Sequence, residues 1–567
     1  MRPFFTLHRA HATLLALTLL ISPWIGACQK KVQEPNRPRL VLLIVVDQLR
    51  TDFIQRWEHR LRPRGLRYLL REGVFFTDAR YLQANTATGP GHATLVTGAS
   101  PSTHGIIGNR WFDRRSRRVR YVVEDPRYQV LGQERIEGEG TSPRNLLSTT
   151  IGDELVMARP DRSRVFSASM KDRSAILLAG HLGKAYWYST LSGDFVTSTY
   201  YEAQYPKWLR DWNRERRVDS YRGKKWRLMR DRETYEFADR DDRPFEIPLL
   251  DLGRTMPHLV SADNDQQFYS VLRATPFADR LLLDFVRDLI DAEEIGRRGA
   301  TDFLAVGFSA SDFVGHAFGP SSLEAEDNFL RTDHVLHELF QFIDKRIGLD
   351  RTVIALSADH GITEAPEYLT ELGFNAGRHV PSEFMARLNR SLKRRFGVTR
   401  DLVIDFVSRD LVLDEGLIER LDLDLEAVER ATAEEAMKMP GFELAVARAD
   451  LLAGTVPSTD LYMRVMNGFR PERGGNVTLV PAQGWFLASD PSPSILTAMH
   501  GSPWVYDSQV PILIAGKRIK RDVVNGRVAP RDLAMTLASY LEIRPPSGSD
   551  GTVLPGVVPL PSRNPLE

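Results

Sequence analysis

Acidic and imidazole side chains occur at four places in the chain, and each place adjoins an apolar run typical of a buried strand. The runs are LVLLIVV, FLAVGF, TVIAL and VPILIA, and the adjoining residues are Asp47, Asp312, His316, Asp359, His360 and His500. Carboxylates and neutral imidazoles that converge on one point bind hard and borderline metal ions. Each residue alone is more often structural, but three Asp and three His together predict a site for two metal ions bridged by an oxygen.

A hydroxyl side chain lies between the first and second of these places, in the segment NTATGPGHAT at residues 85–94. The glycines and the proline interrupt the chain just before an apolar helix predicted at 93–96. A hydroxyl at a helix N-terminus faces unpaired N–H groups and the positive end of the helix dipole, which favours a bound anion. Thr88 is therefore a candidate nucleophile, although composition alone favours a helix N-cap there, and Thr86 and Thr94 are rival hydroxyls.

Strand-like and helix-like runs alternate along the chain, as they do in proteins with a parallel sheet. We predict strands at 40–46, 74–76, 163–167, 303–308, 352–356 and 510–515, and helices at 65–71, 278–290, 323–347 and 529–541. This pattern predicts an α/β fold with a mostly parallel central sheet flanked by helices. Ligands bind such sheets at the carboxyl ends of the strands.

Three stretches fit this alternation poorly, and we interpret them as insertions. They lie near 110–140, near 197–251 and at 365–493, and the last is long enough for an inserted subdomain. The predicted catalytic core then has a first part at 39–364 and a last part at 494–567. The Pro/Gly/Ser-rich tail from Pro545 is expected to be irregular.

The composition narrows the class of protein. The chain has 567 residues, of which 42% are hydrophobic and 26% charged, and this excludes a disordered chain and a coiled coil. The 75 basic and 74 acidic residues nearly cancel, so we expect no nucleic-acid binding. The single cysteine excludes a disulfide framework and a cysteine-rich zinc module.

Residues 1–27 are predicted to form a lipoprotein-type signal peptide. Arg2 and Arg9 flank the start of an apolar stretch that is too short to span a bilayer, and the sequence IGAC at 25–28 resembles a bacterial lipobox. Acylation of Cys28 would anchor the exported protein through a tether at 28–38, and Gln29 favours the outer membrane, facing the periplasm. The alternative is an ordinary cleaved signal with an incidental cysteine.

Taken together, the motifs resemble the alkaline phosphatase superfamily, and most closely its phosphate-irrepressible, monomeric members with a threonine nucleophile. The matching motifs are VVDQLR at 45–50, TGPGHATLVTGASPSTHGIIGN at 88–109, SMKDRSAI at 169–176, SDFVGHAFG at 311–319, SADHG at 357–361 and MHGSPW at 499–504. The resemblance extends from about residue 40 to 555 and is weakest in the insertions.

The resemblance implies two Zn²⁺ ions as cofactors and assigns roles to the residues of these motifs. One zinc ion would be held by Asp47, Asp359, His360 and the Thr88 oxygen, and the other by Asp312, His316 and His500. The residues that bind the non-bridging phosphoryl oxygens would be Asn109, Lys171 and Arg173. His92 and His104 share the motif of Thr88 but not the ligand set, and we interpret them as structural.

The function implied is hydrolysis of small phosphate monoesters, with broad specificity, through a covalent phosphothreonine at Thr88. Phosphodiesterase relatives lack the pair Lys171 and Arg173, and two neighbouring cations suit the extra charge of a monoester dianion. One alternative is a nucleotide pyrophosphatase or phosphodiesterase with the same zinc site. The other is a non-catalytic surface lipoprotein that uses an inactivated fold for binding.

Overall fold

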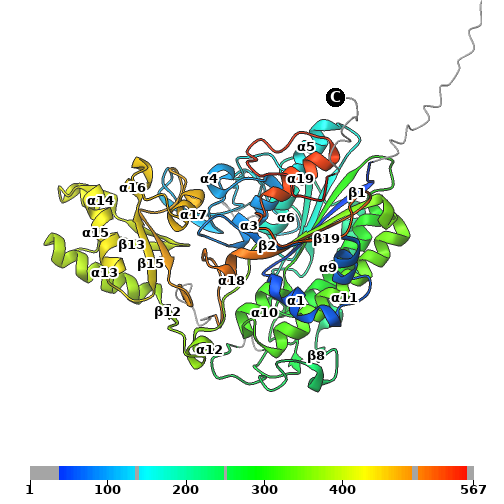
Figure 1. Cartoon of the computed structure of the whole chain (residues 1–567), viewed down its shortest axis with the longest axis horizontal. Helices are drawn as coiled ribbons and strands as arrows, with labels where there is room; N and C mark the ends of the chain where they lie inside the picture. Colours follow the sequence, from blue (N-terminus) through cyan, green and yellow to red (C-terminus); the bar gives the residue numbers. More distant parts are fainter. Residues whose placement is uncertain (1–36, 135–139, 248–251, 488–495, 559–567) are drawn as a thin grey trace, which may run out of the picture. The chain divides into compact units, whose positions relative to one another are not determined.

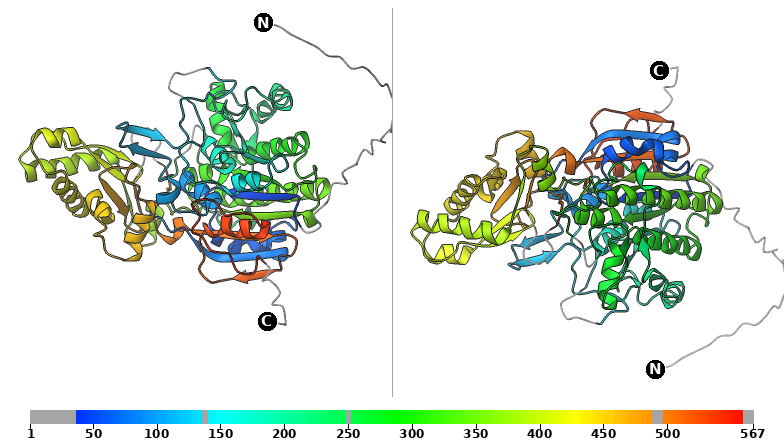
Figure 2. Two further views of the ribbon diagram at one scale, coloured as in Figure 1. Left: turned by 90° about the horizontal axis from the view of Figure 1, so that it is seen from above. Right: turned by 90° about the horizontal axis from the view of Figure 1, so that it is seen from below.

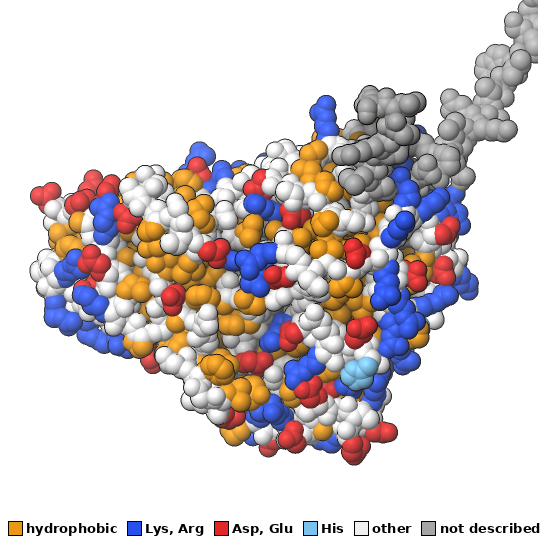
Figure 3. Space-filling model, in the orientation of Figure 1, with side chains coloured by type: hydrophobic (Ala, Val, Ile, Leu, Met, Phe, Trp, Pro, Cys, Tyr) orange, Lys and Arg blue, Asp and Glu red, His pale blue; other side chains and the backbone are white. Residues whose placement is uncertain are grey.

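The structure is a computed structural model that describes residues 37–134, 140–247, 252–487 and 496–558 (Figure 1). The predicted signal peptide, Cys28 and nearly all of the tether lie outside the described residues. In the described part of the chain, no helix is both long and apolar enough to cross a membrane. The face visible in Figure 3 mixes Lys and Arg with Asp and Glu, in keeping with the formal net charge of +1.

A nine-stranded sheet forms the centre of the fold, in the order β19-β2-β18-β11-β1-β10-β5-β6-β7. Its strands are β1 (Leu40–Val46), β2 (Gly73–Arg80), β5 (Val165–Ser169), β6 (Lys184–Tyr188), β7 (Phe195–Val196), β10 (Asp302–Phe308), β11 (Thr352–Ser357), β18 (Gln509–Ala515) and β19 (Asp522–Val524). The pairs β1–β10, β1–β11, β5–β10, β5–β6 and β2–β19 are parallel. The predicted α/β fold with a mostly parallel sheet is therefore confirmed.

Strand β1 shows why this sheet is buried on both faces. All seven residues of LVLLIVV are buried. The even-numbered residues of the strand belong to one hydrophobic cluster, and residues 41, 43 and 45 belong to another. Because alternate residues of a strand point to opposite faces, the two clusters are the two sides of the sheet.

Helices cover both faces (Figure 2). The cluster of the even-numbered β1 residues includes side chains of α1 (Thr51–Trp57), α2 (Leu66–Glu72), α8 (Asp265–Arg273), α9 (Phe277–Ala292) and α11 (Leu323–Arg346). The opposite cluster includes side chains of α3 (Thr88–Thr97), α5 (Ile151–Ala158) and α19 (Asp532–Leu541). The four helices predicted at 65–71, 278–290, 323–347 and 529–541 are thus α2, α9, α11 and α19.

The structure departs from the sequence-based expectation at β18, at the two edge strands and at the start of α3. Strand β18 is antiparallel to both β11 and β2. The sequence did not predict this direction, because an apolar run such as VPILIA indicates burial but not direction. The edge strands β7 and β19 have two and three residues, too few for a recognisable pattern. The helix predicted at 93–96 begins already at Thr88, since proline is tolerated in a first helical turn.

The segment interpreted as an inserted subdomain contains a second sheet of four strands and a separate pair of β12 (Gly377–His379) and β17 (Trp485–Leu487). Its antiparallel strands are β13 (Val403–Val407), β14 (Asp410–Leu413), β16 (Val477–Pro481) and β15 (Phe442–Ala447), in that spatial order. The surrounding helices are α13 (Pro381–Phe396), α14 (Glu415–Arg420), α15 (Leu425–Met437), α16 (Arg448–Ala453) and α17 (Asp460–Gly468). Side chains of α13, α14 and α15 share a separate hydrophobic cluster with these strands.

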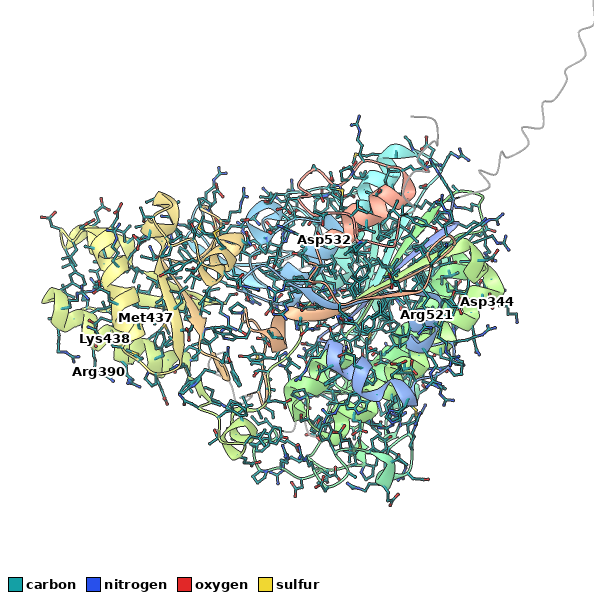
Figure 4. All side chains as sticks on the ribbon, viewed as in Figure 1. Asp344, Arg390, Met437, Lys438, Arg521 and Asp532 are labelled. Atoms are coloured by element: carbon teal, nitrogen blue, oxygen red, sulfur yellow. The ribbon has the colours of Figure 1, made fainter. Side chains whose placement is uncertain are left out.

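The remaining segments outside the core are short. The segment near 110–140 contains a hairpin of β3 (Arg110–Asp113) and β4 (Arg118–Tyr121), and the segment near 197–251 contains α7 (Lys207–Arg214) and β8 (Lys225–Trp226). The C-terminal tail has no helix or strand in its described residues 544–558. Asp532, labelled in Figure 4, holds this tail, because its carboxylate accepts the Thr552 N–H at 2.8 Å.

Candidate metal centre

Acidic and imidazole side chains meet at the carboxyl ends of the central strands. Asp47 follows β1, and Asp359 and His360 follow β11, its parallel neighbour. The His360 Nε2 atom lies 3.4 Å from both Asp47 Oδ1 and Asp359 Oδ2. Within the described residues, these three buried atoms have no hydrogen-bond partner. Unpaired, converging oxygen and nitrogen atoms of this kind fit a metal ion.

A second group lies beside the first. Asp312 and His316 stand one turn apart on α10 (Ala310–Phe318), which follows β10, and His500 precedes α18 (Val505–Ser508). The Asp312 Oδ1 atom lies 3.2 Å from His316 Nε2 and 3.6 Å from His500 Nε2. The His500 ring stacks on the His360 ring with centroids 3.5 Å apart, which joins the two groups. The structure thus brings all six predicted ligands together as two groups of three.

The three imidazoles present the nitrogen that a metal ion requires. His316, His360 and His500 each place Nδ1 2.8 or 2.9 Å from a backbone carbonyl oxygen. Because a carbonyl only accepts, Nδ1 carries the hydrogen and Nε2 keeps its lone pair. Histidines that bind metals are usually oriented by such a hydrogen bond.

Three buried carboxylates give the site a strong negative charge. The Lys171 Nζ atom lies 2.5 Å from Asp47 Oδ2 and 2.6 Å from Asp312 Oδ2. Burial, and then the Asp359 carboxylate, raise the pKa of Asp47 well above its usual value. Burial also raises the pKa of Asp312, but Lys171 and His316 outweigh it and hold that pKa well below its usual value. One ammonium group does not balance three carboxylates, so these residues fit additional cations.

Thr88 begins α3 and is only 1% exposed. Its Oγ1 atom accepts a hydrogen bond from Arg173 Nη2 at 3.4 Å. At Gly91, in the same first turn, a Cβ atom would come within 2.2 Å of the Asp359 carbonyl oxygen. The glycine therefore allows the first turn of α3, which contains Thr88, to pack closely against Asp359, the predicted ligand after β11.

Two further polar side chains, Asn109 and Arg173, lie at the start of α3. The Asn109 Oδ1 atom accepts the Gly89 N–H at 2.7 Å, which leaves its Nδ2 hydrogens free to donate. Arg173 lies in the first turn of α6 (Asp172–Ala179), and the Tyr121 hydroxyl donates to Asp172 at 2.7 Å. Burial lowers the pKa of Arg173, but Tyr121 and Asp172 more than offset this and raise it above its usual value. The guanidinium is therefore charged beside Thr88.

The rival hydroxyls and the additional histidines have other partners. The Thr86 Oγ1 atom donates to a backbone carbonyl at 2.8 Å, and Thr94 Oγ1 pairs with His104 Nε2 at 3.1 Å. The His92 Nδ1 atom lies 3.2 Å from Asp359 Oδ2, behind the first group. Neither His92 nor His104 belongs to either group of three.

Gln48 contacts both groups and was not among the predicted site residues. Its N–H donates to Asp359 Oδ1 at 3.1 Å, and its Nε2 donates to Asp312 Oδ1 at 2.9 Å. Its φ of +66° lies in the left-handed region, where the backbone of a residue with a Cβ atom is strained. The sequence signal that could have indicated it is its position directly after Asp47.

Arg409 reaches the site from the second sheet. It lies in the turn between β13 and β14, and its guanidinium donates to the His500 carbonyl at 3.0 Å and to the Gly501 carbonyl at 2.7 Å. The two partners are 91 and 92 residues away along the chain, so no local pattern could have indicated this contact.

Comparisons with known proteins give one family model and several long matches. Residues 41–503 match the model for type I phosphodiesterase / nucleotide pyrophosphatase. Alkaline phosphatase PhoV of Synechococcus elongatus is 34% identical over 525 residues, which are 92% of this chain and 93% of the relative. Alkaline phosphatase PafA of Elizabethkingia meningoseptica is 30% identical over 548 residues, 95% of this chain and 98% of the relative.

Solved structures match over similar lengths. The crystal structure of wild-type PafA has a TM-score of 0.84 at 31% identity and covers 91% of this chain and 98% of its own. A second crystal structure is of a PafA variant substituted at a threonine, an asparagine, a lysine and an arginine. By contrast, ectonucleotide pyrophosphatase/phosphodiesterase family member 3 of Mus musculus is 34% identical over only 99 residues, 16% of this chain and 11% of the relative.

Proposed function

The chain belongs to the type I phosphodiesterase / nucleotide pyrophosphatase family and is an alkaline phosphatase, and we propose that it hydrolyses phosphate monoesters with two zinc ions and Thr88 as the nucleophile. One observation carries this proposal: two groups of three ligands, with three unpaired ligand atoms in the first, stand next to a hydroxyl at a helix N-terminus. Histidine nitrogens and carboxylates in equal number suit zinc.

The PafA variant supports the proposed phosphoryl-binding residues. In that enzyme the substituted asparagine, lysine and arginine follow the threonine by 21, 83 and 85 positions. Asn109, Lys171 and Arg173 follow Thr88 by the same 21, 83 and 85 positions. Positions that were substituted together in a phosphatase thus have the same order and spacing as the four residues around the metal centre here.

In the proposed reaction, Thr88 Oγ gives up its proton and forms a bond to phosphorus, while the bond from phosphorus to the leaving-group oxygen breaks and that oxygen takes up a proton. The oxygen of a water molecule then bonds to phosphorus, the bond from phosphorus to Thr88 Oγ breaks, and one proton of the water passes to Oγ, which releases hydrogen phosphate and restores the hydroxyl. Asn109, Lys171 and Arg173 donate to the non-bridging oxygens and hold the phosphoryl group in line with Oγ. Zinc ions at the two groups supply a lowered hydroxyl pKa and a positive charge that stabilises the attacking and departing oxygens.

Monoesters are favoured over diesters because of the cations near Thr88. A monoester dianion carries one more negative charge on its non-bridging oxygens than a diester, and the Lys171 and Arg173 pair offers two positive charges. The matches to the alkaline phosphatases PhoV and PafA cover 92% and 95% of this chain, whereas the match to ectonucleotide pyrophosphatase/phosphodiesterase family member 3 covers 16%. A phosphodiesterase using the same metal centre is the second candidate, since the family model bears that description.

The test compares an aryl phosphate with its methyl aryl diester on the zinc-loaded enzyme. We expect the monoester to be clearly faster, Thr88→Ala to abolish turnover of both, and Lys171→Ala and Arg173→Ala to reduce monoester turnover more than diester turnover. A faster diester would favour the second candidate. Monoester turnover that is unchanged in both cation variants would contradict the proposed specificity, and full activity of Thr88→Ala would contradict the mechanism.

We also propose that the enzyme is exported and acts as a periplasmic or outer-membrane lipoprotein and as a monomer. The support for the anchor is the IGAC sequence at 25–28. Mass spectrometry of the mature N-terminus should find an acylated Cys28, and Cys28→Ala should release the protein from the membrane fraction. An unmodified N-terminus, or a variant that stays with the membrane, would contradict the anchor.

A further inference from the structure

A third cation, Arg273, lies near the candidate metal centre and has no hydrogen-bond or ion-pair partner among the described residues. Arg273 is the last residue of α8, and its guanidinium lies over the Phe313 ring, 4.8 Å from the centroid. Within the described residues, no hydrogen bond or ion pair reaches this guanidinium, and its Nε atom is buried without a partner. The terminal nitrogens of Arg273 are not among the buried unpaired atoms, so they face space that an anionic ligand can enter, and such a ligand would supply the acceptors that the described residues do not.

The Phe313 ring connects Arg273 to the site. Phe313 directly follows Asp312 on α10, and the Lys171 Nζ atom lies 5.0 Å from the centroid of the same ring. Lys171 contacts one carboxylate of each group, so a single aromatic side chain separates Arg273 from the centre of the site. Burial, and then the charge of Arg173, lower the pKa of Arg273, which agrees with two guanidinium groups in one neighbourhood.

The other cations of the site are already engaged. Lys171 pairs with Asp47 and Asp312, and Arg173 contacts the Thr88 hydroxyl. Arg273 stands beside Phe313, which directly follows the predicted ligand Asp312, and among the described residues it has a hydrogen bond neither to Thr88 nor to a carboxylate. The leaving group is the only part of a phosphate monoester that extends beyond the phosphoryl group, so a cation near the site that does not bind the phosphoryl group can contact the substrate only there.

We propose that Arg273 binds a second anionic group, a carboxylate or a phosphate, on the leaving group of a phosphate monoester. This inference rests on the proposed function, because it requires that phosphate monoesters be the substrates. The planar guanidinium offers two parallel N–H donors that match either anion, and partial burial strengthens the charge-assisted hydrogen bonds. The site would thereby favour doubly anionic monoesters over those with a neutral leaving group.

The experiment uses pairs of substrates that differ in the second anion alone. O-Phosphoserine and O-phosphoethanolamine differ by one carboxylate, and 1,3-propanediol bisphosphate and 3-hydroxypropyl phosphate differ by one phosphate. The zinc-loaded enzyme should show a higher kcat/KM for the doubly anionic member of at least one pair. Arg273→Gln should lower that preference by about 10-fold, the factor expected for one charged hydrogen-bond partner, and Arg273→Lys should lower it less. The pair with the larger change identifies the anion.

A matched control packs against the same helix. The Arg222 guanidinium lies over the Phe268 ring of α8, 4.0 Å from the centroid, but unlike Arg273 it is paired with an acidic residue, Asp265, at 2.6 Å. Arg222→Gln should leave both preferences as they are. An equal loss on both members of each pair in Arg273→Gln, or no change in either preference, would overturn the inference. If the wild-type enzyme hydrolyses neither an aryl phosphate nor any of these four monoesters, the proposed function itself is wrong.

Discussion

The contact of Arg409 with the His500 segment predicts a defect of metal binding from a residue outside the central sheet. Replacing Arg409 with methionine keeps an unbranched side chain but removes the two hydrogen bonds to the His500 and Gly501 carbonyls. The His500 segment is also held by Thr86, whose carbonyl oxygen lies 2.8 Å from His500 Nδ1 and whose hydroxyl donates to the Ser502 carbonyl. With one side of this support lost, the imidazole no longer keeps a fixed direction toward Asp312.

The expected magnitude follows from the number and type of the bonds. Hydrogen bonds with a charged donor contribute ~1.5–3 kcal/mol each, and the loss of two is partly offset because the buried guanidinium no longer has to be desolvated. We therefore expect the free energy of unfolding to fall by ~2–3 kcal/mol. Loss of a group that orients a metal ligand typically weakens metal binding 10–100-fold, so the effect on zinc affinity should exceed what the stability change explains.

Arg464 provides a matched control. It also lies in the second-sheet segment, is 7% exposed as Arg409 is, and donates to the Tyr81 carbonyl of the core at 2.7 Å, but it does not touch a metal ligand. Both methionine variants should melt at lower temperature, whereas only Arg409→Met should bind the second zinc ion more weakly in a titration of the metal-free protein against a chromophoric chelator. Equal zinc affinities in the two variants would refute the reasoning.

Three further perturbations have defined outcomes. Gln48→Gly and Gln48→Ala both remove the amide that donates to Asp312, but only glycine relieves the backbone at φ +66°, so the glycine variant should be the more stable of the two by ~1 kcal/mol in urea titrations, and both should lose phosphatase activity; an alanine variant as stable as the glycine variant, or full activity in both, would contradict this. Asp47→Asn should stabilise the metal-free protein, because burial and Asp359 raise the pKa of Asp47, but should abolish stabilisation by added zinc, as a melting curve with and without the ion would show. Burial, and then Arg473, lower the pKa of His104 to about 3. Between pH 6.5 and pH 3 only the unfolded chain binds this proton, so the free energy of unfolding should fall by ~1.4 kcal/mol for each pH unit of acidification. Urea titrations of His104→Gln should lack that part of the acid dependence.

The two groups of Asp and His residues could be predicted because each member lies next to a strand that is unmistakable in the sequence. Asp47 follows seven apolar residues, and Asp359 follows a run that pairs with them in parallel. Since parallel strands present their carboxyl ends on one edge of the sheet, residues far apart in sequence converge without any further information. The same reasoning located Asp312 and its partner one helical turn later.

The contacts that sequence reasoning missed all depend on tertiary packing. Arg409 lies in a hairpin turn of the second sheet, and its guanidinium resembles that of many other arginines until the hairpin is placed against the His500 segment. Arg273 ends an ordinary amphipathic helix, and its lack of an acceptor is visible only in three dimensions. The antiparallel direction of β18 likewise depends on how the chain returns from the second sheet to the core.

The position of Lys171 links metal binding to substrate choice. Its ammonium lies between the two groups, within 2.6 Å of a carboxylate oxygen from each, and a charge so placed neutralises part of the repulsion among three buried carboxylates. When zinc supplies that neutralisation, the carboxylates no longer need the ammonium, and Lys171 becomes available to the phosphoryl oxygens. Replacing Lys171 with alanine should therefore affect the two forms of the protein differently. The metal-free protein should lose stability, because the ammonium no longer offsets the carboxylates. The zinc-loaded protein should keep its stability and lose monoester turnover. A similar loss of stability in both forms would mean that Lys171 is a structural ion-pair partner and that the preference for dianions arises elsewhere.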